Sequence, residues 1–342
     1  MIRVGVVGFG YWGPNLARNF REVPDARLVA VSDARPERLE LAGTRYAGVA
    51  VTPDARALID DPGVDAVAIA TPVSTHFDLA MAALRAGKHV LLEKPLTSSA
   101  DEAYRLIETA ERQRLLLMVD HTFVYTGAVR KIEELMRARD LGDLYYYDSV
   151  RVNLGLVQHD VSVLWDLAVH DLAIMDHVLQ ATPLALTATG VSHLPGHPED
   201  VAYLTLYFPD NVLAHFHVNW LAPVKVRRTL IGGSRRMIVY DDLEPSEKVK
   251  VYDRGITVSN GSDTAYRMLV DYRTGDMWAP QVDPTEALLT VARHFIACIE
   301  KAERPITDAY AGLRIVRLLE AASRSVAARG RLIELDGDDA VR

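Results

Sequence analysis

A glycine-rich loop near the start of the chain is the first pattern that indicates chemistry. It follows a short apolar run, opens a helical pattern, and reads Gly8-Phe9-Gly10-Tyr11-Trp12-Gly13. In such a loop the first glycine permits a tight turn, the second lets the backbone approach a diphosphate, and the third lets helix and strand pack closely. The helix start offers free N–H groups to phosphates. The loop predicts a dinucleotide site that includes Tyr11 and Trp12; the alternative is a tight turn without a ligand.

Asp33 ends the next apolar run, at the distance from the loop that a ribose-binding carboxylate requires. A carboxylate there accepts hydrogen bonds from the adenosine ribose and repels a 2′-phosphate, so it favours NAD over NADP. Arg35 and Arg38 follow closely and soften that preference. The alternative role for Asp33, as the N-cap of a helix that starts near Pro36, is compatible with ribose binding.

Residues 1–120 must supply the sheet that positions this loop. Short apolar runs that barely alternate, as in strands buried on both faces, occur at Ile2–Val7, Leu28–Val31, Ala66–Ala70, His89–Leu92 and Leu115–Val119. Helical spacing lies between them, at Asn15–Arg21, Pro36–Tyr46, His76–Arg85 and Ala100–Arg112. This alternation predicts an α/β domain with a doubly wound parallel sheet of Rossmann type.

Residues 121–342 contain many strand signals and few helical ones, and they predict a second, α+β domain on a largely antiparallel open sheet. Strand signals occur at Leu144–Val152, Ala185–Val191, Val201–Phe208, Val212–Trp220, Val226–Ile231, Met237–Tyr240 and Lys248–Tyr252. Helices are expected at Ala128–Arg139, Val163–Leu179, 285–300 and 309–329, whereas residues 254–284 are irregular in sequence. A sheet covered on one side leaves an open face, which favours a homodimer or homotetramer.

Composition excludes several classes of protein. The 342 residues carry 38 Lys and Arg against 46 Asp and Glu, a formal charge of −8, which argues against a nucleic-acid partner. We see neither a long apolar run that would cross a membrane nor a signal-peptide pattern. The single cysteine, Cys298, leaves no internal disulfide. These features together predict a soluble, cytoplasmic protein.

Further motifs follow the glycine loop in a fixed order. They are Ala70-Thr71-Pro72 with His76, Glu93-Lys94-Pro95, Asp166-Leu-Ala-Val-His170-Asp171 and Pro305-Ile-Thr-Asp308. With this set the chain resembles the Gfo/Idh/MocA family, named for glucose–fructose oxidoreductase, inositol dehydrogenase and a rhizopine-catabolism protein. The resemblance covers nearly the whole chain. It implies a Rossmann domain, an open-sheet domain, an active site between them and an NAD(P)-dependent dehydrogenase acting on CH–OH groups of a sugar.

Some segments are similar to a subgroup linked to oxidation at C3 of UDP-N-acetylhexosamines. They are Tyr11–Leu16, Trp220–Arg228 and Tyr240–Asp242. The implied substrate is a nucleotide sugar such as UDP-N-acetylglucosamine or its uronic acid. Many family members carry Arg-Phe where this chain has Phe123-Val124-Tyr125, so this chain lacks the arginine that the resemblance would assign to substrate binding there. Phe123 and Tyr125 remain candidate substrate-binding residues.

Oxidation of a secondary alcohol needs a hydride acceptor, a base and a donor that steadies the alkoxide. The resemblance points to His170 as the base, which suits an imidazole, and to Lys94 as the cationic donor to the substrate hydroxyl. A neutral lysine acting as base would need a pKa about 2–3 units below its usual value. Asp166, four residues before His170, shares its helix face and either orients the imidazole or binds a sugar hydroxyl.

The remaining motif residues are assigned to the cofactor. Thr71, Pro72 and His76 follow a strand at the edge where doubly wound sheets bind ligands, although a helix-capping role is equally open. Glu93 is expected to bond near the nicotinamide ribose or the loop backbone. A cis Lys94–Pro95 bond would aim Lys94 into the cleft.

No metal site is expected, since the polar residues around Asp166 lack a compact ligand signature. The set weighed for a metal is His159, Asp160, Asp166, His170, Asp171, Asp176 and His177. Asp171, Asp176 and His177 are expected to solvate the helix or to pair locally. His215 and His217 share one face of a strand, which favours an exposed or interface position. Three other functions stay open: an inositol or free-sugar dehydrogenase, a glycosidase that uses NAD transiently, and a non-catalytic NAD sensor.

Overall fold

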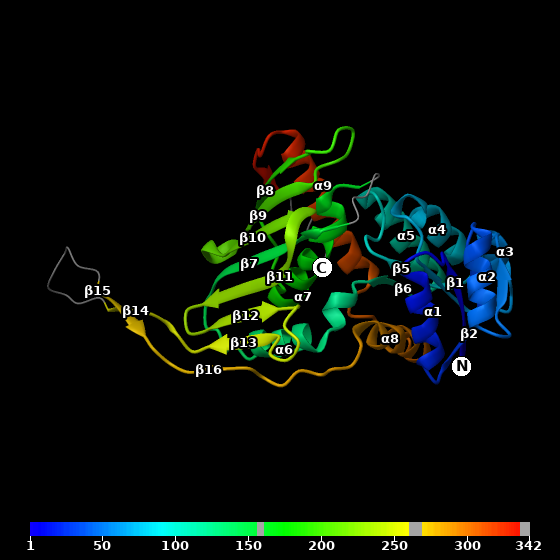
Figure 1. The fold of residues 1–342 in the computed structure, drawn as a ribbon, viewed down its shortest axis with the longest axis horizontal. Helices are drawn as coiled ribbons and strands as arrows, with labels where there is room; N and C mark the ends of the chain where they lie inside the picture. Colours follow the sequence, from blue (N-terminus) through cyan, green and yellow to red (C-terminus); the bar gives the residue numbers. More distant parts are fainter. Residues whose placement is uncertain (156–160, 260–268, 336–342) are drawn as a thin grey trace. The chain divides into compact units, whose positions relative to one another are not determined.

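The structure of the protein is a computed structural model that describes residues 1–155, 161–259 and 269–335. The chain divides into two compact units, each with its own sheet (Figure 1). The first unit holds residues 1–126 and 285–320. The second holds residues 127–284 and, of the described residues that follow, 321–335.

The sheet of the first unit has six parallel strands in the order β3-β2-β1-β4-β5-β6. The strands are β1 (Ile2–Val7), β2 (Ala26–Ser32), β3 (Ala50–Thr52), β4 (Ala66–Ile69), β5 (His89–Glu93) and β6 (Leu117–Asp120). This order confirms the predicted Rossmann sheet, and its direction of winding changes between β1 and β4, where such sheets bind dinucleotides. β1 and β4 lie at the centre of the sheet, and their side chains are almost fully buried, as Val4, Val6 and Val67 show.

The first unit's helices are α1 (Gly13–Glu22), α2 (Pro36–Arg45), α3 (Ala55–Asp60), α4 (His76–Arg85), α5 (Ala100–Gln113), α8 (Ala287–Lys301) and α9 (Ala309–Ala327), of which α9 continues into the second unit from Ala321. Two 3₁₀ turns, η1 (Val73–Thr75) and η2 (Thr122–Tyr125), follow β4 and β6. Helix α5 begins where the sequence indicates, because Ser99 caps it by accepting a hydrogen bond from the Glu102 N–H. In the described parts of the chain, no helix combines the length and the apolar character needed to span a bilayer.

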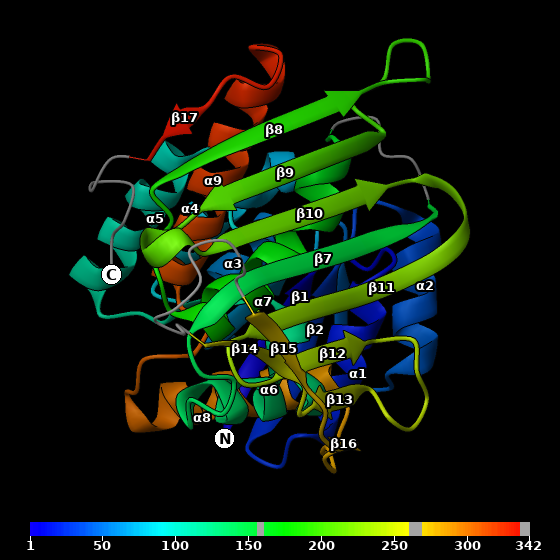
Figure 2. The same ribbon diagram turned by 90° about the vertical axis from the view of Figure 1, so that its left-hand side faces the viewer.

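The sheet of the second unit has nine strands in the order β16-β13-β12-β11-β7-β10-β9-β8-β17 (Figure 2). They are β7 (Leu144–Leu154), β8 (Ala185–Val191), β9 (Val201–Tyr207), β10 (Leu213–Asn219), β11 (Leu221–Gly233), β12 (Met237–Asp241), β13 (Val249–Tyr252), β16 (Met277–Trp278) and β17 (Ile333–Glu334). Every neighbouring pair is antiparallel except β7 with β10. The predicted largely antiparallel sheet is confirmed.

Helices cover one face of this sheet and leave the other uncovered (Figure 2). The second unit's own helical segments are α6 (Gly127–Arg137), a π-helical turn η3 (Leu164–Ala168), α7 (Val169–Leu179) and a 3₁₀ turn η4 (Pro209–Asn211). Alternation along β9 shows the two faces: Ala202, Leu204 and Leu206 are buried, whereas Tyr203 and Tyr207 are exposed. The helix expected over Val163–Leu179 is present as η3 followed directly by α7, and its first turn is π-helical, which widens the backbone there.

The described residues between 254 and 284 contain more regular structure than their sequence indicates. Strands β14 (Gly255–Ser259) and β15 (Leu269–Arg273) pair antiparallel as a separate two-stranded sheet, and β16 joins the edge of the large sheet. Gly, Asp, Pro and Ser make this segment look irregular because these residues are depleted in strands. Pairing with a partner strand overrides that weak local preference.

Candidate active site

The glycine loop joins β1 to α1 in the conformation that the motif predicts. Gly8 has φ +90°, and a Cβ there would lie 2.6 Å from the carbonyl oxygen of Ala70 at the end of β4. A Cβ at Gly13 would lie 1.9 Å from the Gly8 carbonyl oxygen. Both positions therefore require glycine. Helix α1 carries no side-chain cap at its first turn, so no described side chain takes up the N–H groups that a phosphate would bind, and the Arg35 guanidinium lies beside Gly10 of the same loop.

Asp33 lies directly beneath this loop and is 7% exposed. Its carboxylate accepts hydrogen bonds from the Phe9 N–H at 2.7 Å and from the backbone and guanidinium of Arg35 at 3.0 Å. Burial alone would raise the pKa of Asp33, but the hydrogen bonds from Arg35 and Phe9 outweigh it and lower the pKa. Asp33 is therefore an ionised acceptor. Its predicted alternative role was wrong, since the N-cap of α2 is Arg35 and no side chain caps that helix.

His76 connects the loops that follow β4 and β5. Its Nδ1 lies 2.9 Å from the Pro95 carbonyl oxygen and its Nε2 lies 2.9 Å from the Thr71 carbonyl oxygen. Burial lowers the pKa of His76, whereas the contacts of its two ring nitrogens with the Pro95 and Thr71 carbonyls oppose that change. The Thr75 hydroxyl donates to Thr71 Oγ1 at 2.7 Å, which fixes the Thr71-Pro72 turn. The structure thus brings Thr71, Pro72 and His76 together, and the Lys94–Pro95 peptide beside them is cis.

The chain after β6 holds polar residues that the sequence analysis did not select. Asp120 ends the strand, and His121 follows it with 2% exposure. Burial, together with the nearby charges of Lys94 and Arg314, lowers the pKa of His121 to about 3. Neither ring nitrogen of His121 has a hydrogen-bond partner within the described chain. The signal that could have found them is a polar pair directly after a buried strand at the ligand-binding edge.

His76 and His121 differ in a way that stability measurements can test. Leucine at position 76 removes the imidazole from the buried Pro95 carbonyl and the partly buried Thr71 carbonyl, and we expect a loss of about 1–3 kcal/mol in the free energy of unfolding. Leucine at position 121 removes a buried imidazole that has no partner, so we expect a change of less than about 1 kcal/mol. Urea denaturation of His76→Leu and His121→Leu checks this. Equal losses in both variants would show that His121 makes a structural contact after all.

Phe123 and Tyr125 lie on η2, just beyond β6. Phe123 is half-buried, whereas Tyr125 is buried and its hydroxyl lies 3.0 Å from Thr307 Oγ1. Burial raises the pKa of Tyr125. Within the first unit, Tyr125 therefore joins η2 to the segment before α9, and Phe123 is the more accessible of the two candidate substrate-binding residues.

Asp166 and His170 lie in the second unit, on the π turn and at the start of α7. Both are half-buried. The indole N–H of Trp220, at the end of β10, donates to Asp166 Oδ2 at 3.1 Å, and Trp220 itself is 1% exposed. Trp220 is therefore a buried residue that holds Asp166.

Asp171 corrects one expectation. It neither solvates α7 nor pairs locally, because it is buried and accepts two hydrogen bonds from Arg151 of β7, at 2.7 and 2.9 Å. His177 does not pair locally either, since its imidazole lies 3.3 Å from the carboxylate of Glu133 on another helix, α6. The side chain of Arg151 therefore lies on the face of β7 that packs against α7.

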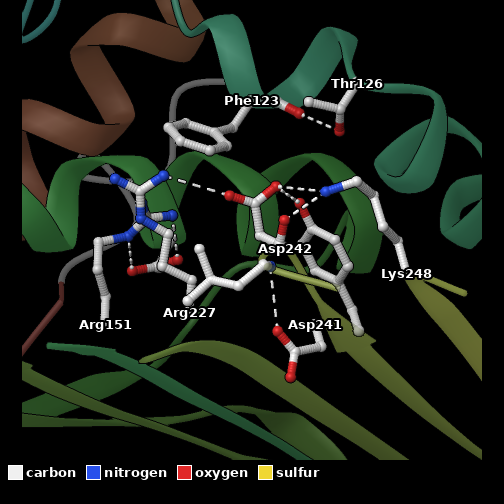
Figure 3. A network of polar contacts seen from close by, with 10 residues as sticks. Phe123, Thr126, Arg151, Arg227, Asp241, Asp242 and Lys248 are labelled. Carbon is white, nitrogen blue, oxygen red and sulfur yellow. Dashed lines mark hydrogen bonds and ion pairs between the residues drawn. The ribbon is translucent and has the colours of Figure 1, made fainter. Parts of the chain in front are cut away.

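A second polar network lies on β11, β12 and the loop after them (Figure 3). Asp242 is its centre: it accepts hydrogen bonds from Arg227 at 3.2 Å and from the Tyr240 hydroxyl at 3.1 Å. Lys248 lies 3.7 Å from the same carboxylate. Two segments that resemble the nucleotide-sugar subgroup, Trp220–Arg228 and Tyr240–Asp242, are thus joined through one carboxylate.

The histidines of β10 lie on the uncovered face of the sheet. The rings of Tyr203 and His217 stack with centroids 4.6 Å apart, and His215 Nδ1 lies 3.0 Å from Thr205 Oγ1. As for metals, His159 and Asp160 lie outside the described residues. Within residues 1–155, 161–259 and 269–335, no group of three potential ligands from His, Cys, Asp and Glu comes together.

Two family models match the chain. Residues 2–121 match the oxidoreductase family with an NAD-binding Rossmann fold, and residues 129–239 match the GFO/IDH/MocA C-terminal domain. The chain belongs to the Gfo/Idh/MocA family. As a member of this family it binds NAD and is an oxidoreductase that acts on CH–OH groups.

Relatives within the Gfo/Idh/MocA family span nearly its full length. UDP-N-acetylglucosamine 3-dehydrogenase of Acidithiobacillus ferrooxidans is 28% identical over 92% of this chain and 94% of its own. Myo-inositol 2-dehydrogenase of Thermotoga maritima is 25% identical over 95% of this chain and 96% of its own. A solved structure of the Acidithiobacillus enzyme matches with a TM-score of 0.79 and 26% identity, covering 96% of this chain and 98% of that one.

Proposed function

We propose that this protein transfers a hydride between NAD and a secondary alcohol or ketone of a nucleotide sugar, such as C3 of UDP-N-acetylglucosamine or of its uronic acid. One observation carries the proposal. This chain contains Lys94, Asp166 and His170, and 92% of its length matches UDP-N-acetylglucosamine 3-dehydrogenase of Acidithiobacillus ferrooxidans. The joined segments around Asp242 support the nucleotide-sugar class.

The first unit fits the cofactor. The turn at Gly8 has no room for a side chain, so the backbone there can approach a diphosphate. No side chain caps the start of α1, and the ionised carboxylate of Asp33 can accept hydrogen bonds from the ribose hydroxyls. Bound NAD supplies the hydride acceptor that protein side chains lack. The residues assigned to it are Gly8, Gly10, Tyr11, Trp12, Gly13, Asp33, Thr71, Pro72, His76, Glu93 and Lys94.

We assign the remaining chemistry to three side chains. The Lys94 ammonium donates a hydrogen bond to the substrate hydroxyl and stabilises the negative charge that develops on its oxygen. The His170 imidazole accepts the hydroxyl proton. Asp166, held by the Trp220 indole, orients the imidazole or binds a neighbouring sugar hydroxyl.

A substrate panel tests the proposal. UDP-N-acetylglucosamine, its uronic acid, myo-inositol and scyllo-inositol are each incubated with NAD, and NADH is followed by absorbance. Turnover of a UDP sugar at least about tenfold above that of both inositols, as kcat/KM, supports the proposal. Turnover confined to the inositols contradicts the substrate class and supports the second candidate.

That second candidate is an inositol or free-sugar dehydrogenase. It is favoured by the likeness to myo-inositol 2-dehydrogenase, which covers 95% of this chain, and to the scyllo-inositol 2-dehydrogenase of Bacillus subtilis, which covers 89%. Analysis of products in the same panel distinguishes a glycosidase that uses NAD transiently, because it would release free sugar without net NADH.

We further propose a cytoplasmic homo-oligomer built through the uncovered sheet face, where Tyr203 and Tyr207 are exposed. Aspartate at position 203 places a charge in that face, so we expect Tyr203→Asp to dissociate the oligomer. Tyr104→Asp on α5 is the matched control, since the two tyrosines are 44% and 47% exposed. Sedimentation velocity measures the outcome. A monomeric wild type, or dissociation by both variants, would contradict this interface.

A further inference from the structure

Two carboxyl groups end adjacent strands at the ligand-binding edge of the first unit. Glu93 is the last residue of β5 and Asp120 the last of β6, and the two are partners in the register of the parallel ladder. Asp120 is 1% exposed. Two ionised carboxylates held side by side away from water repel each other strongly. The pair therefore needs either a bound cation or a shared proton.

The contacts of Asp120 mark it as an acceptor. The Trp12 indole N–H donates to Asp120 Oδ2 at 3.1 Å, and the Thr122 hydroxyl donates to Oδ1 at 2.7 Å. Both neighbours supply hydrogens, so both oxygens of Asp120 act as they do in an ionised carboxylate.

Glu93 has the opposite pattern. Its Oε2 accepts the backbone N–H of Lys94 at 3.0 Å, whereas Oε1 is shielded from solvent and has no donor within the described chain. An oxygen without a donor, beside a carboxylate that accepts, is where a proton is most stable. Burial raises the pKa of Glu93 well above its usual range, the charge of Asp120 raises it further, and Lys94 opposes both. Burial also raises the pKa of Asp120, but hydrogen bonds from Thr122, Trp12 and Glu93 oppose that rise.

We propose that Glu93 and Asp120 hold one proton between them, with the Glu93 hydroxyl donating to Asp120, and that the pair positions Lys94. The chain of contacts runs from the Trp12 indole of the glycine loop, through the two carboxyl groups, to the backbone N–H of Lys94. It fixes the backbone that carries the Lys94 ammonium to the loop that binds the diphosphate. Glu93 and Asp120 are thus positioning residues. The part played by Lys94 rests on the proposed function, whereas the shared proton does not.

The surroundings of the pair agree with a single negative charge. Lys94 follows Glu93 and is the cation that acts on both carboxyl groups. His121 follows Asp120 and is neutral, because burial and the charges of Lys94 and Arg314 of α9 lower its pKa. Burial and the charge of Lys94 also lower the pKa of His76 on α4. One negative charge on the pair therefore matches the single positive charge of Lys94, which acts on both carboxyl groups.

The proton has a measurable consequence for stability. The pKa of Glu93 is higher in the folded protein than in the unfolded chain, so folding retains a proton that the unfolded chain releases. This contribution to stability is present below a pH of about 4.3 and is lost as the pH rises through the raised pKa. Glutamine at position 93 donates to Asp120 through its amide and does not titrate. We expect the Tm of Glu93→Gln to rise relative to wild type as the pH increases.

The stability experiment is a pair of Tm series from pH 4.5 to 9, with no substrate present. Glu108→Gln, an exposed residue of α5, is the matched control, and its Tm difference from wild type should stay constant with pH. A constant difference for Glu93→Gln as well would overturn the shared proton. Because this measurement needs neither substrate nor turnover, its failure is distinct from a failure of the proposed function.

Tryptophan fluorescence provides a second test, since the Trp12 indole is bonded to the pair. Loss of the shared proton places a second charge near Trp12, so wild type should show a pH-dependent change in fluorescence. This change should disappear in Glu93→Gln and in Trp12→Phe. It should persist in Trp165→Phe, whose indole donates to Ser323 in the second unit. A change that persists in Trp12→Phe would contradict the assignment.

The positioning role is tested at Asp120. Asparagine there presents an N–H to partners that are themselves donors, which breaks the link to Trp12 or to Glu93. We expect Asp120→Asn to lower kcat by at least about tenfold, because small displacements of a reacting group reduce turnover strongly. Wild-type kcat in a folded Asp120→Asn protein would overturn positioning through the pair.

Discussion

Lys94→Met and His170→Asn should each lower turnover by at least about 100-fold, while NAD still binds through the glycine loop and Asp33. The lysine variant lacks the cation that stabilises the developing alkoxide, and the histidine variant lacks the group that accepts the proton. Neither change alters the Gly8 turn or Asp33, which provide the predicted contacts to the cofactor. Initial rates of NADH formation and a titration of NAD by calorimetry measure the two effects separately.

Each control lies in the same unit of the fold as the residue it matches. Lys301→Met at the exposed end of α8 and His177→Asn on α7 remove the same groups elsewhere, and both should retain turnover within about threefold. If both active-site variants kept wild-type turnover, Lys94 and His170 would have no catalytic role. If NAD binding were lost in parallel with turnover, the effect would lie in the cofactor site and not in the chemical step.

The first unit was predictable because its signals are local. Strands buried on both faces appear in the sequence as short apolar runs. The spacing of the glycines in the loop predicts the tight turn that the structure has at Gly8 and Gly13. The elements that escaped prediction are β3 and α3, with three and six residues. Elements so short contain less than two periods of their pattern, so the alternation of apolar and polar residues does not reveal them.

The site was predictable only where its residues belong to an ordered set of motifs. The segments around Lys94 and His170 stood out through resemblance, and Asp33 through its distance from the loop. Asp120 did not stand out, because one carboxylate after a strand resembles an ordinary loop residue. Its importance comes from contacts with Trp12 and Glu93, which are 108 and 27 positions away in sequence. No local pattern reports such a pair.

The buried ion pair between Arg151 and Asp171 supports a second prediction, a large loss in the free energy of unfolding when one partner is removed. Their side chains are 3% and 5% exposed, and the guanidinium binds the carboxylate through two hydrogen bonds. Removal of either partner takes away both charge-assisted hydrogen bonds of a group that stays buried away from water. We expect Arg151→Met or Asp171→Leu alone to lower the free energy of unfolding by about 3–5 kcal/mol. Denaturation in urea, followed by circular dichroism, measures it.

The double variant Arg151→Met/Asp171→Leu distinguishes the charge from the packing. It removes both charges while keeping side chains of similar volume between β7 and α7, so it should recover to within about 2 kcal/mol of wild type. Additive losses would mean that shape, not charge balance, holds α7 on the sheet. Because Asp171 directly follows His170, the two outcomes differ for catalysis as well. A recovered fold with reduced kcat would show that the ion pair orients the first turn of α7, and with it the imidazole, beyond what packing provides.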